Sequence, residues 1–148
     1  MTDRKFGIAI VGALGLGFVL LMGRKARPVA FTIDGEEIRD TVILFPASIH
    51  IASIIIDNPT GDVITGGVEV RVQPDIPELR WSGGINRLPA HSKGEIGVEA
   101  PIHIPLQTPP GTYRVYVEWS YFRPLISLDE KYWKGILPGK IVIEDILD

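Results

Sequence analysis

The chain contains no cysteine among its 148 residues. Disulfide bonds, thiolate metal sites and a thiol nucleophile are therefore excluded. Only three histidines occur, His50, His91 and His103, and no two of them have the short spacing of a compact metal site, although strands can bring His50 and His103 together. Nucleophile elbows, phosphate-binding glycine loops and nucleotide fingerprints are also missing. We expect a protein without catalytic residues, metal, cofactor or small-molecule substrate.

One short loop is rich in oxygen-bearing side chains. Asp57, Asn58, Thr60 and Asp62 lie within six residues. Hard cations such as Ca²⁺ require six to eight oxygen ligands, so four are too few for a site built from this loop alone. An Asx-type turn ended by Gly61 is the simpler interpretation.

Charge is distributed unevenly along the chain. Residues 1–27 carry five basic side chains and one acidic side chain, a net charge of +4. Because the whole chain has a net charge of −3, residues 28–148 have a net charge of −7. An acidic domain argues against nucleic acid as a partner. The basic flanks of residues 1–27 suit anionic lipid headgroups; they are Arg4, Lys5, Arg24, Lys25 and Arg27.

A run of 17 residues, 6–22, has no charged or strongly polar side chain. A helix of this length is about 25 Å long, within the lower end of the range that spans a bilayer. We expect a transmembrane anchor over residues 1–27 and a separate domain over 28–148. The predicted membrane-spanning residues are Phe6, Ile8, Ile10, Val11, Leu14, Leu16, Phe18, Val19, Leu20, Leu21 and Met22, and the predicted helix-packing residues are Ala9, Ala13 and Gly17.

Two other interpretations of this run stay open. A cleaved secretory signal has the same basic start and apolar centre, but the sequence after Met22, GRKARP, is a poor cleavage site. A buried helix of a soluble core normally shows a polar stripe, which this run lacks. The numbers of basic residues on the two flanks are nearly equal, so the positive-inside rule leaves the topology open.

The remaining sequence predicts strands separated by turns. Val29–Ile33, Thr41–Phe45, Ile49–Ile56 and Lys140–Ile146 are rich in β-branched residues. Three further segments alternate in polarity, with one parity expected to face the core: Val68, Val70 and Val72; Ile96, Val98, Ala100, Ile102 and Ile104; and Tyr113, Val115, Val117, Trp119 and Tyr121. About seven such strands predict an all-β, Ig-like antiparallel sandwich, here joined to one N-terminal transmembrane helix.

Several turn motifs resemble those of bacterial and archaeal Ig-like domains of the cell-adhesion-related and fibronectin-type-III-like kind. They are Asn58-Pro-Thr-Gly61, the segment from Leu88 to Gly94, and Pro109-Pro-Gly-Thr-Tyr113, and the likeness extends over about residues 41–146. The resemblance implies the fold rather than a function. It also implies that Tyr113 is a tyrosine-corner residue whose hydroxyl bonds to nearby backbone.

Large apolar residues gather in two segments expected to be loops, 74–89 and 122–137. Aromatic residues and arginine in loops are common anchors of protein interfaces. The predicted partner-binding residues are Trp81, Phe122, Leu125, Ile126, Tyr132 and Trp133. Two alternatives stay open: these loops cover the ends of the sandwich, or Tyr132 and Trp133 belong to an aromatic belt at a membrane surface.

Together these features predict a non-enzymatic, single-pass membrane protein that presents an Ig-like domain next to a bilayer. Its expected partners are lipid and other proteins of an assembly, including copies of itself, either at a cell surface or in a virion that contains a membrane. The domain is expected outside the cytoplasm or on the capsid side. Alternatives are a secreted carbohydrate- or protein-binding module, with Trp81 and Trp133 as stacking platforms, and a pilin-like filament subunit.

Overall fold

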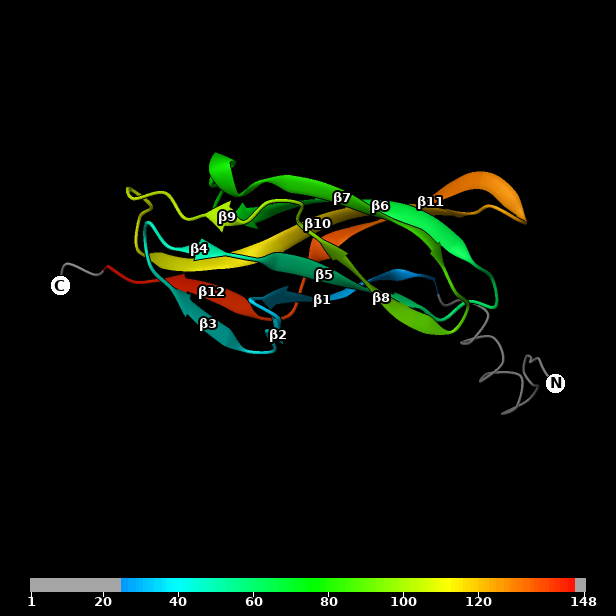
Figure 1. The fold of residues 1–148 in the computed structure, drawn as a ribbon, viewed down its shortest axis with the longest axis horizontal. Coiled ribbons are helices and arrows are strands. Elements are labelled where there is room, and N and C mark those ends of the chain that lie inside the picture. The colour runs from blue at the N-terminus through cyan, green and yellow to red at the C-terminus, as the bar shows by residue number, and fades with distance from the viewer. Residues whose placement is uncertain (1–24, 146–148) are drawn as a thin grey trace.

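The computed structural model describes residues 25–145, which form two packed β-sheets and a separate two-stranded sheet of β4 and β9 (Figure 1). One sheet has the strand order β2-β1-β5-β8. The other has the order β3-β12-β10-β6-β7, with β11 also paired to β10. The bounds are β1 Arg27–Ile33, β2 Glu36–Glu37, β3 Thr41–Leu44, β4 Ile49–His50, β5 Ala52–Asn58, β6 Ile64–Gln73, β7 Trp81–Leu88, β8 Ser92–Gly97, β9 Ile102–His103, β10 Gly111–Arg123, β11 Ser127–Ile136 and β12 Lys140–Ile143, with a 3₁₀ turn at Pro77–Leu79.

The core lies between the two sheets and follows the predicted alternation on β6 and β10. The third alternating segment is only partly as predicted, because β8 ends at Gly97 and Ala100 is exposed. On β6 the three valines Val68, Val70 and Val72 are buried. On β10 the five residues of one parity are all buried, from Tyr113 to Tyr121. They meet apolar residues of the smaller sheet such as Phe31, Ile54 and Ile56 in a single hydrophobic cluster. The predicted all-β, Ig-like class is therefore confirmed.

The predicted tyrosine corner is present. The Tyr113 hydroxyl donates a hydrogen bond to the Pro109 carbonyl at 2.6 Å, four residues earlier. The ring itself is buried, and this burial raises the pKa of the phenol. The bond fixes the turn that leads into β10, the strand that organises the larger sheet.

β10 is long enough to have two successive neighbours on one side. Its first residues pair with β12, from Gly111 to Tyr113, and its later residues pair with β11, from Tyr116 to Arg123. Its other side pairs with β6 over nearly its whole length. The second half of β10 and β11 thus form an extended hairpin at one end of the domain (Figure 1).

Several details differ from the sequence-based expectation. The segments 74–89 and 122–137 are not loops, because they contain β7 and β11. The sandwich is not wholly antiparallel, since β3 runs parallel to β12. The chain crosses from the smaller sheet to the larger one between β2 and β3, and this crossing leaves β3 in the same direction as β12. The run 49–56 is divided at Ile51 into β4 and β5.

The predicted anchor lies outside the described residues, which begin at Lys25. Within residues 25–145 no helix is long and apolar enough to cross a membrane. The β-domain begins slightly before the predicted boundary at residue 28. β1 starts at Arg27, and Ala26 is already fully buried in the core.

Candidate interaction surface

The β10–β11 hairpin carries the most exposed apolar residues of the predicted contact set. The turn closes when the Ile126 amide donates to the Arg123 carbonyl at 2.9 Å. Leu125, Ile126 and Leu128 are 75%, 58% and 79% exposed. We call these three residues the hairpin tip. Folding leaves their apolar surface in water, so the needs of the core do not account for their hydrophobic character.

The hairpin is tied to the rest of the domain near its tip. The Arg123 guanidinium is 3.1 Å from the Asp62 carboxylate. Asp62 belongs to the loop after β5, so this ion pair joins the larger sheet to the smaller one. Both side chains are about one third exposed, and such a pair contributes little free energy. The direction of the hairpin is set mainly by the pairing of β10 with β6 and β11.

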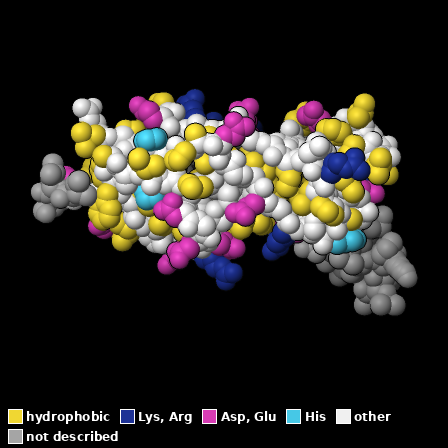
Figure 2. All heavy atoms as spheres, viewed as in Figure 1, with side chains coloured by type: hydrophobic (Ala, Val, Ile, Leu, Met, Phe, Trp, Pro, Cys, Tyr) yellow, Lys and Arg dark blue, Asp and Glu magenta, His cyan; other side chains and the backbone are white. Residues whose placement is uncertain are grey.

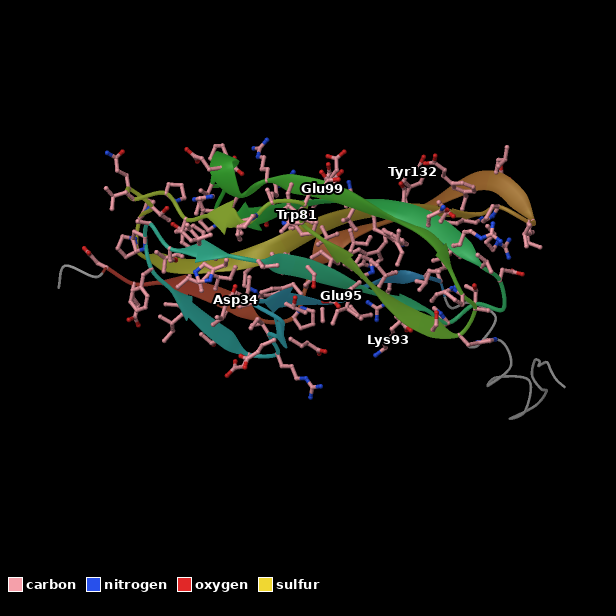
Figure 3. The ribbon with its side chains drawn as sticks, in the orientation of Figure 1. Asp34, Trp81, Lys93, Glu95, Glu99 and Tyr132 are labelled. Carbon is pink, nitrogen blue, oxygen red and sulfur yellow. The ribbon has the colours of Figure 1, made fainter. Side chains whose placement is uncertain are left out.

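The six predicted contact residues are placed in two groups. Leu125, Ile126 and Tyr132 are exposed, and Tyr132 points to the outer side of the hairpin (Figure 3). The Tyr132 hydroxyl donates to Glu130 Oε1 at 2.9 Å, which raises the pKa of Tyr132. Phe122, Trp81 and Trp133 are half-buried.

The two half-buried tryptophans pack inward. Trp133 lies opposite Trp119 on β10, and Trp81 lies opposite Val70 on β6, so both share a face with buried residues. Both rings pack against the hydrophobic cluster. Neither ring stands out from the surface in the way that a stacking platform for a sugar requires.

The chain enters the domain beside this hairpin, held by two buried hydrogen bonds. The Trp119 indole N–H donates to the Ala26 carbonyl at 3.0 Å. The Ala26 amide donates to the Tyr121 hydroxyl at 3.3 Å. The Trp119 and Tyr121 rings are stacked with centroids 5.7 Å apart. We call this arrangement the entry clasp; no local sequence signal reveals it, because its partners are more than 90 residues apart.

The entry point and the hairpin tip lie at the same end of the molecule. Arg27, at the start of β1, lies opposite Asp57 near the end of β5. From there β1 runs toward Ile33, away from the loop that contains Asp62, the partner of Arg123. A groove of about 350 Å³ lies between the entering chain and the hairpin, lined by residues that include Lys25, Arg27, Tyr132 and Trp133. Lys25 and Arg27 are exposed and outnumber Asp57 in the same groove, so the entry carries a net positive charge.

A second group of exposed apolar residues lies elsewhere on the domain; its members are Ile43, Phe45, Ile49, Ile51 and Leu106. Figure 2 shows hydrophobic side chains at both ends of one face, with acidic side chains over its middle. The sequence pattern does not distinguish these residues from core residues, because most of them lie in or beside a β-branched run.

The outer face of the larger sheet is polar. A shallow depression of about 290 Å³ is lined by residues that include Glu69, Ser82 and Glu118. Within it the Arg71 guanidinium lies 4.3 Å from the centroid of the Tyr116 ring, and its Nη1 is 3.8 Å from Glu118. Arg71 is thus paired with both the Tyr116 ring and Glu118, which gives this face a solvated, structural character.

One polar cluster has the order of groups found in nucleophilic triads. His50 Nε2 is 2.7 Å from Ser48 Oγ, and His50 Nδ1 is 2.7 Å from Asp34 Oδ2. However, the Ser48 hydroxyl donates to the Phe45 carbonyl at 2.6 Å, and the Ser48 amide also donates to that carbonyl. The hydroxyl is therefore committed to a turn, and its own amide is not free to stabilise an oxyanion.

This cluster holds two turns together. Asp34 Oδ1 accepts from the Ile51 amide while Oδ2 binds His50, and these bonds lower the pKa of Asp34, the His50 bond most strongly. Asp34 opens the two-residue turn between β1 and β2, with a φ of 53° that Asp tolerates better than most residues. The cluster thus joins that turn to the β3–β4 connection.

The other candidate metal ligands are not gathered together. β4 and β9 do pair, but His50 lies opposite Ile102 and His103 opposite Ile49, so the two histidines point to opposite faces. In residues 25–145 no group of three or more histidine or acidic side chains is arranged to hold a metal ion.

The loop 57–62 is organised by a buried asparagine, as the Asx interpretation predicts. Asn58 Nδ2 lies within hydrogen-bond distance of the Asp62, Leu88 and Pro89 carbonyls, at 2.9, 3.3 and 2.9 Å. Its Oδ1 accepts from the Thr60 amide and hydroxyl. The Asn58 side chain, which a cation site in this loop would need, is thus already hydrogen-bonded within the protein. Its bonds join the loop to the β7–β8 connection.

No family model matches the chain, and no curated protein matches its sequence. Similar solved structures include a PapD-like domain of human CEP192 (10% identity, 79% of this chain, 88% of that chain, TM-score 0.40). They also include the E. coli chaperone DraB (9%, 80%, 56%, 0.41) and the C-terminal domain of Wzt (12%, 79%, 75%, 0.39). At such values the likeness carries no argument about partners. The strand order and the single core described above identify residues 25–145 as an Ig-like β-sandwich, a fold that serves many functions.

Proposed function

We propose that this protein is a non-enzymatic, membrane-tethered interaction module. Residues 6–22 form the tether, and the β-sandwich is presented at the bilayer surface as a component of a larger assembly. The observation that carries the proposal is the coincidence, at one end of the sandwich, of the basic entry of the chain and the exposed apolar hairpin tip. Both features are expected of an end that faces other components.

The entry clasp supports a close tether. Ala26 is fixed to Trp119 and Tyr121 in the core, and only Gly23, Arg24 and Lys25 separate it from the apolar run. A spacer of three residues gives the domain little freedom relative to an anchor. This is useful in an assembly, because a domain held in a limited set of orientations loses less entropy when it binds.

The secreted sugar-binding alternative receives less support. Its two proposed platforms, Trp81 and Trp133, pack against the core. A non-catalytic role is supported by the committed hydroxyl of Ser48, which leaves the triad-like cluster as a clamp between turns.

Fractionation of the full-length protein tests the proposal. We expect the intact chain, confirmed by mass, to remain with membranes in alkaline carbonate and to be released only by detergent. Leu14→Lys, which places a charge in the centre of the run at a cost of about 3 kcal/mol, should weaken membrane retention, whereas Leu14→Ile should not. A carbonate-soluble product that lacks residues 1–27 would overturn the tether.

A further inference from the structure

We propose that the hairpin tip inserts into the same bilayer that holds the tether, so that the domain contacts the membrane at two points. This inference rests on the proposed function, because it requires residues 6–22 to span the membrane. Its occupant is the headgroup region and outer hydrocarbon of the lipid, rather than a second protein. The inference depends on how far the tip reaches compared with how long the linker is.

The linker is short. Three residues lie between Met22, the last of the apolar run, and Ala26, which the entry clasp fixes. Four fully extended Cα–Cα steps cover at most about 14 Å. The polar headgroup layer occupies roughly 5–8 Å of this distance on each side of the hydrocarbon. Ala26 is therefore held close to the headgroups.

The hairpin reaches further than this linker. From Trp119, which holds Ala26, β10 continues through Arg123 to a turn at Leu125 and Ile126. At about 3.3 Å per residue, the tip extends roughly 20 Å beyond the level of the clasp. It extends toward the end where the chain enters, since β1 runs in the opposite sense from Arg27. When the hairpin points at the membrane, its tip meets the bilayer before the linker is fully extended.

The chemistry of the hairpin suits lipid. The three tip side chains are aliphatic and 58–79% exposed, so their insertion recovers a hydrophobic contribution that folding does not supply. Behind them, Tyr132 has an apolar ring and a polar hydroxyl, the combination found at membrane interfaces. The charges of β11, Asp129 and Glu130 against Lys131 and Lys134, sum to zero. Beside them Lys25 and Arg27 exceed Asp57 by one positive charge. No net repulsion from anionic headgroups is expected.

The lack of cysteine allows a direct test with single nitroxide labels. Full-length Leu125→Cys is labelled and placed in vesicles of phosphatidylcholine and phosphatidylglycerol. Collision with oxygen, which concentrates in hydrocarbon, is then compared with collision with a water-soluble nickel chelate. Leu106→Cys is the matched control, because Leu106 is also a leucine, 71% exposed, and away from the hairpin. Leu14→Cys reports on the tether itself.

We expect the label at residue 125 to favour oxygen over nickel, as the label at residue 14 does, while the label at residue 106 stays aqueous. If the label at 14 is in hydrocarbon but the labels at 125 and 128 (Leu128→Cys) are aqueous, tip insertion is wrong and the tether stands. If the label at 14 is also aqueous, both proposals fail. Magnetic broadening between labels at 125 that disappears on dilution with unlabelled protein, together with low oxygen collision, would assign the tip to a second copy and overturn insertion.

Discussion

At the scale of single residues, Asn58 is expected to contribute strongly to stability through its hydrogen bonds. It is fully buried, and its amide serves carbonyls in two loops while its oxygen accepts from Thr60. Asn58→Ala leaves buried backbone groups without partners, so we expect a loss of about 3 kcal/mol in the free energy of unfolding, measured in urea. Asn86→Ala is the control. Asn86 is exposed and accepts one hydrogen bond from Thr65, and its loss should change stability by less than about 0.5 kcal/mol.

The contact between Asp34 and His50 predicts a dependence of stability on acid. The native pKa of Asp34 lies below its ordinary value of 3.8, mainly because of the His50 hydrogen bond. The folded state therefore binds this proton less readily than the unfolded state. The contribution is present above about pH 4 and is lost as pH falls through the lower native pKa.

The variant Asp34→Asn removes this dependence. We expect the difference in unfolding free energy between the native protein and Asp34→Asn to be fully present at pH 5 and to shrink toward pH 2. The effect is modest, since the Asp34 side chain is 53% exposed. Unfolding in urea at several pH values measures it, and a difference that grows below pH 4 would contradict the assignment.

At the scale of elements, Gly66 on β6 permits the close approach of β10. A Cβ atom at this position would lie 2.5 Å from the Trp119 ring and 2.6 Å from the Ser120 carbonyl. Since Trp119 also holds the entry clasp, the ring has little freedom to move. We expect Gly66→Ala to destabilise the domain by about 1–3 kcal/mol and to alter Trp fluorescence.

A matched substitution on the other sheet separates this steric effect from the general effect of removing a glycine. A Cβ atom added at Gly97, in β8, would meet no atom within 4 Å apart from its own chain neighbours. Gly97→Ala should therefore be neutral or slightly stabilising in the same urea titration. Equal losses at both positions would show that the contact with Trp119 is not the cause.

A comparison of four strands shows why the sequence predicted some strands and not others. β6 and β10 alternate between apolar and polar residues because one face of each is buried, and this alternation is visible in the sequence. β11 breaks the rule: Leu128 and Tyr132 are exposed, whereas Gly135 is half-buried. In β7 an inward-facing position is occupied by Gly83, opposite Val68, so the alternation of apolar and polar side chains is interrupted there. Neither β7 nor β11 has a readable period of two.

The candidate surface was predicted in the same uneven way. The sequence points to Leu125, Ile126 and Tyr132 because large apolar groups in a connection between strands are hard to explain by the core alone. All three are exposed, and their role in contacts stays a prediction. The inward packing of Trp81 and Trp133 depends on β7 and β11, which the sequence pattern does not predict as strands. The entry clasp and the Asp34–His50 contact join distant segments, and only the folded topology brings such groups together.

At the scale of the whole molecule, the hairpin tip is expected to be dispensable for folding. Leu125 and Leu128 are at least 75% exposed, so Leu125→Asp with Leu128→Asp should change the unfolding free energy by less than about 0.5 kcal/mol for each substitution. Val117→Ala, at a fully buried position, should cost about 1–3 kcal/mol and serves as the contrast. Strong destabilisation by the tip variant would mean that these residues cover the core.

The parallel pairing of β3 with β12 has a consequence for synthesis on the ribosome. Thr41 lies opposite Lys140, so about 100 further residues must be synthesised after β3 before its partner strand exists. At 5–20 residues per second this interval is roughly 5–20 s. Throughout this interval the nascent chain exposes Leu44, which is buried in the folded domain, and an unpaired strand edge. Until the last strand closes the sheet, β3 can therefore pair with the strand edge of another nascent chain.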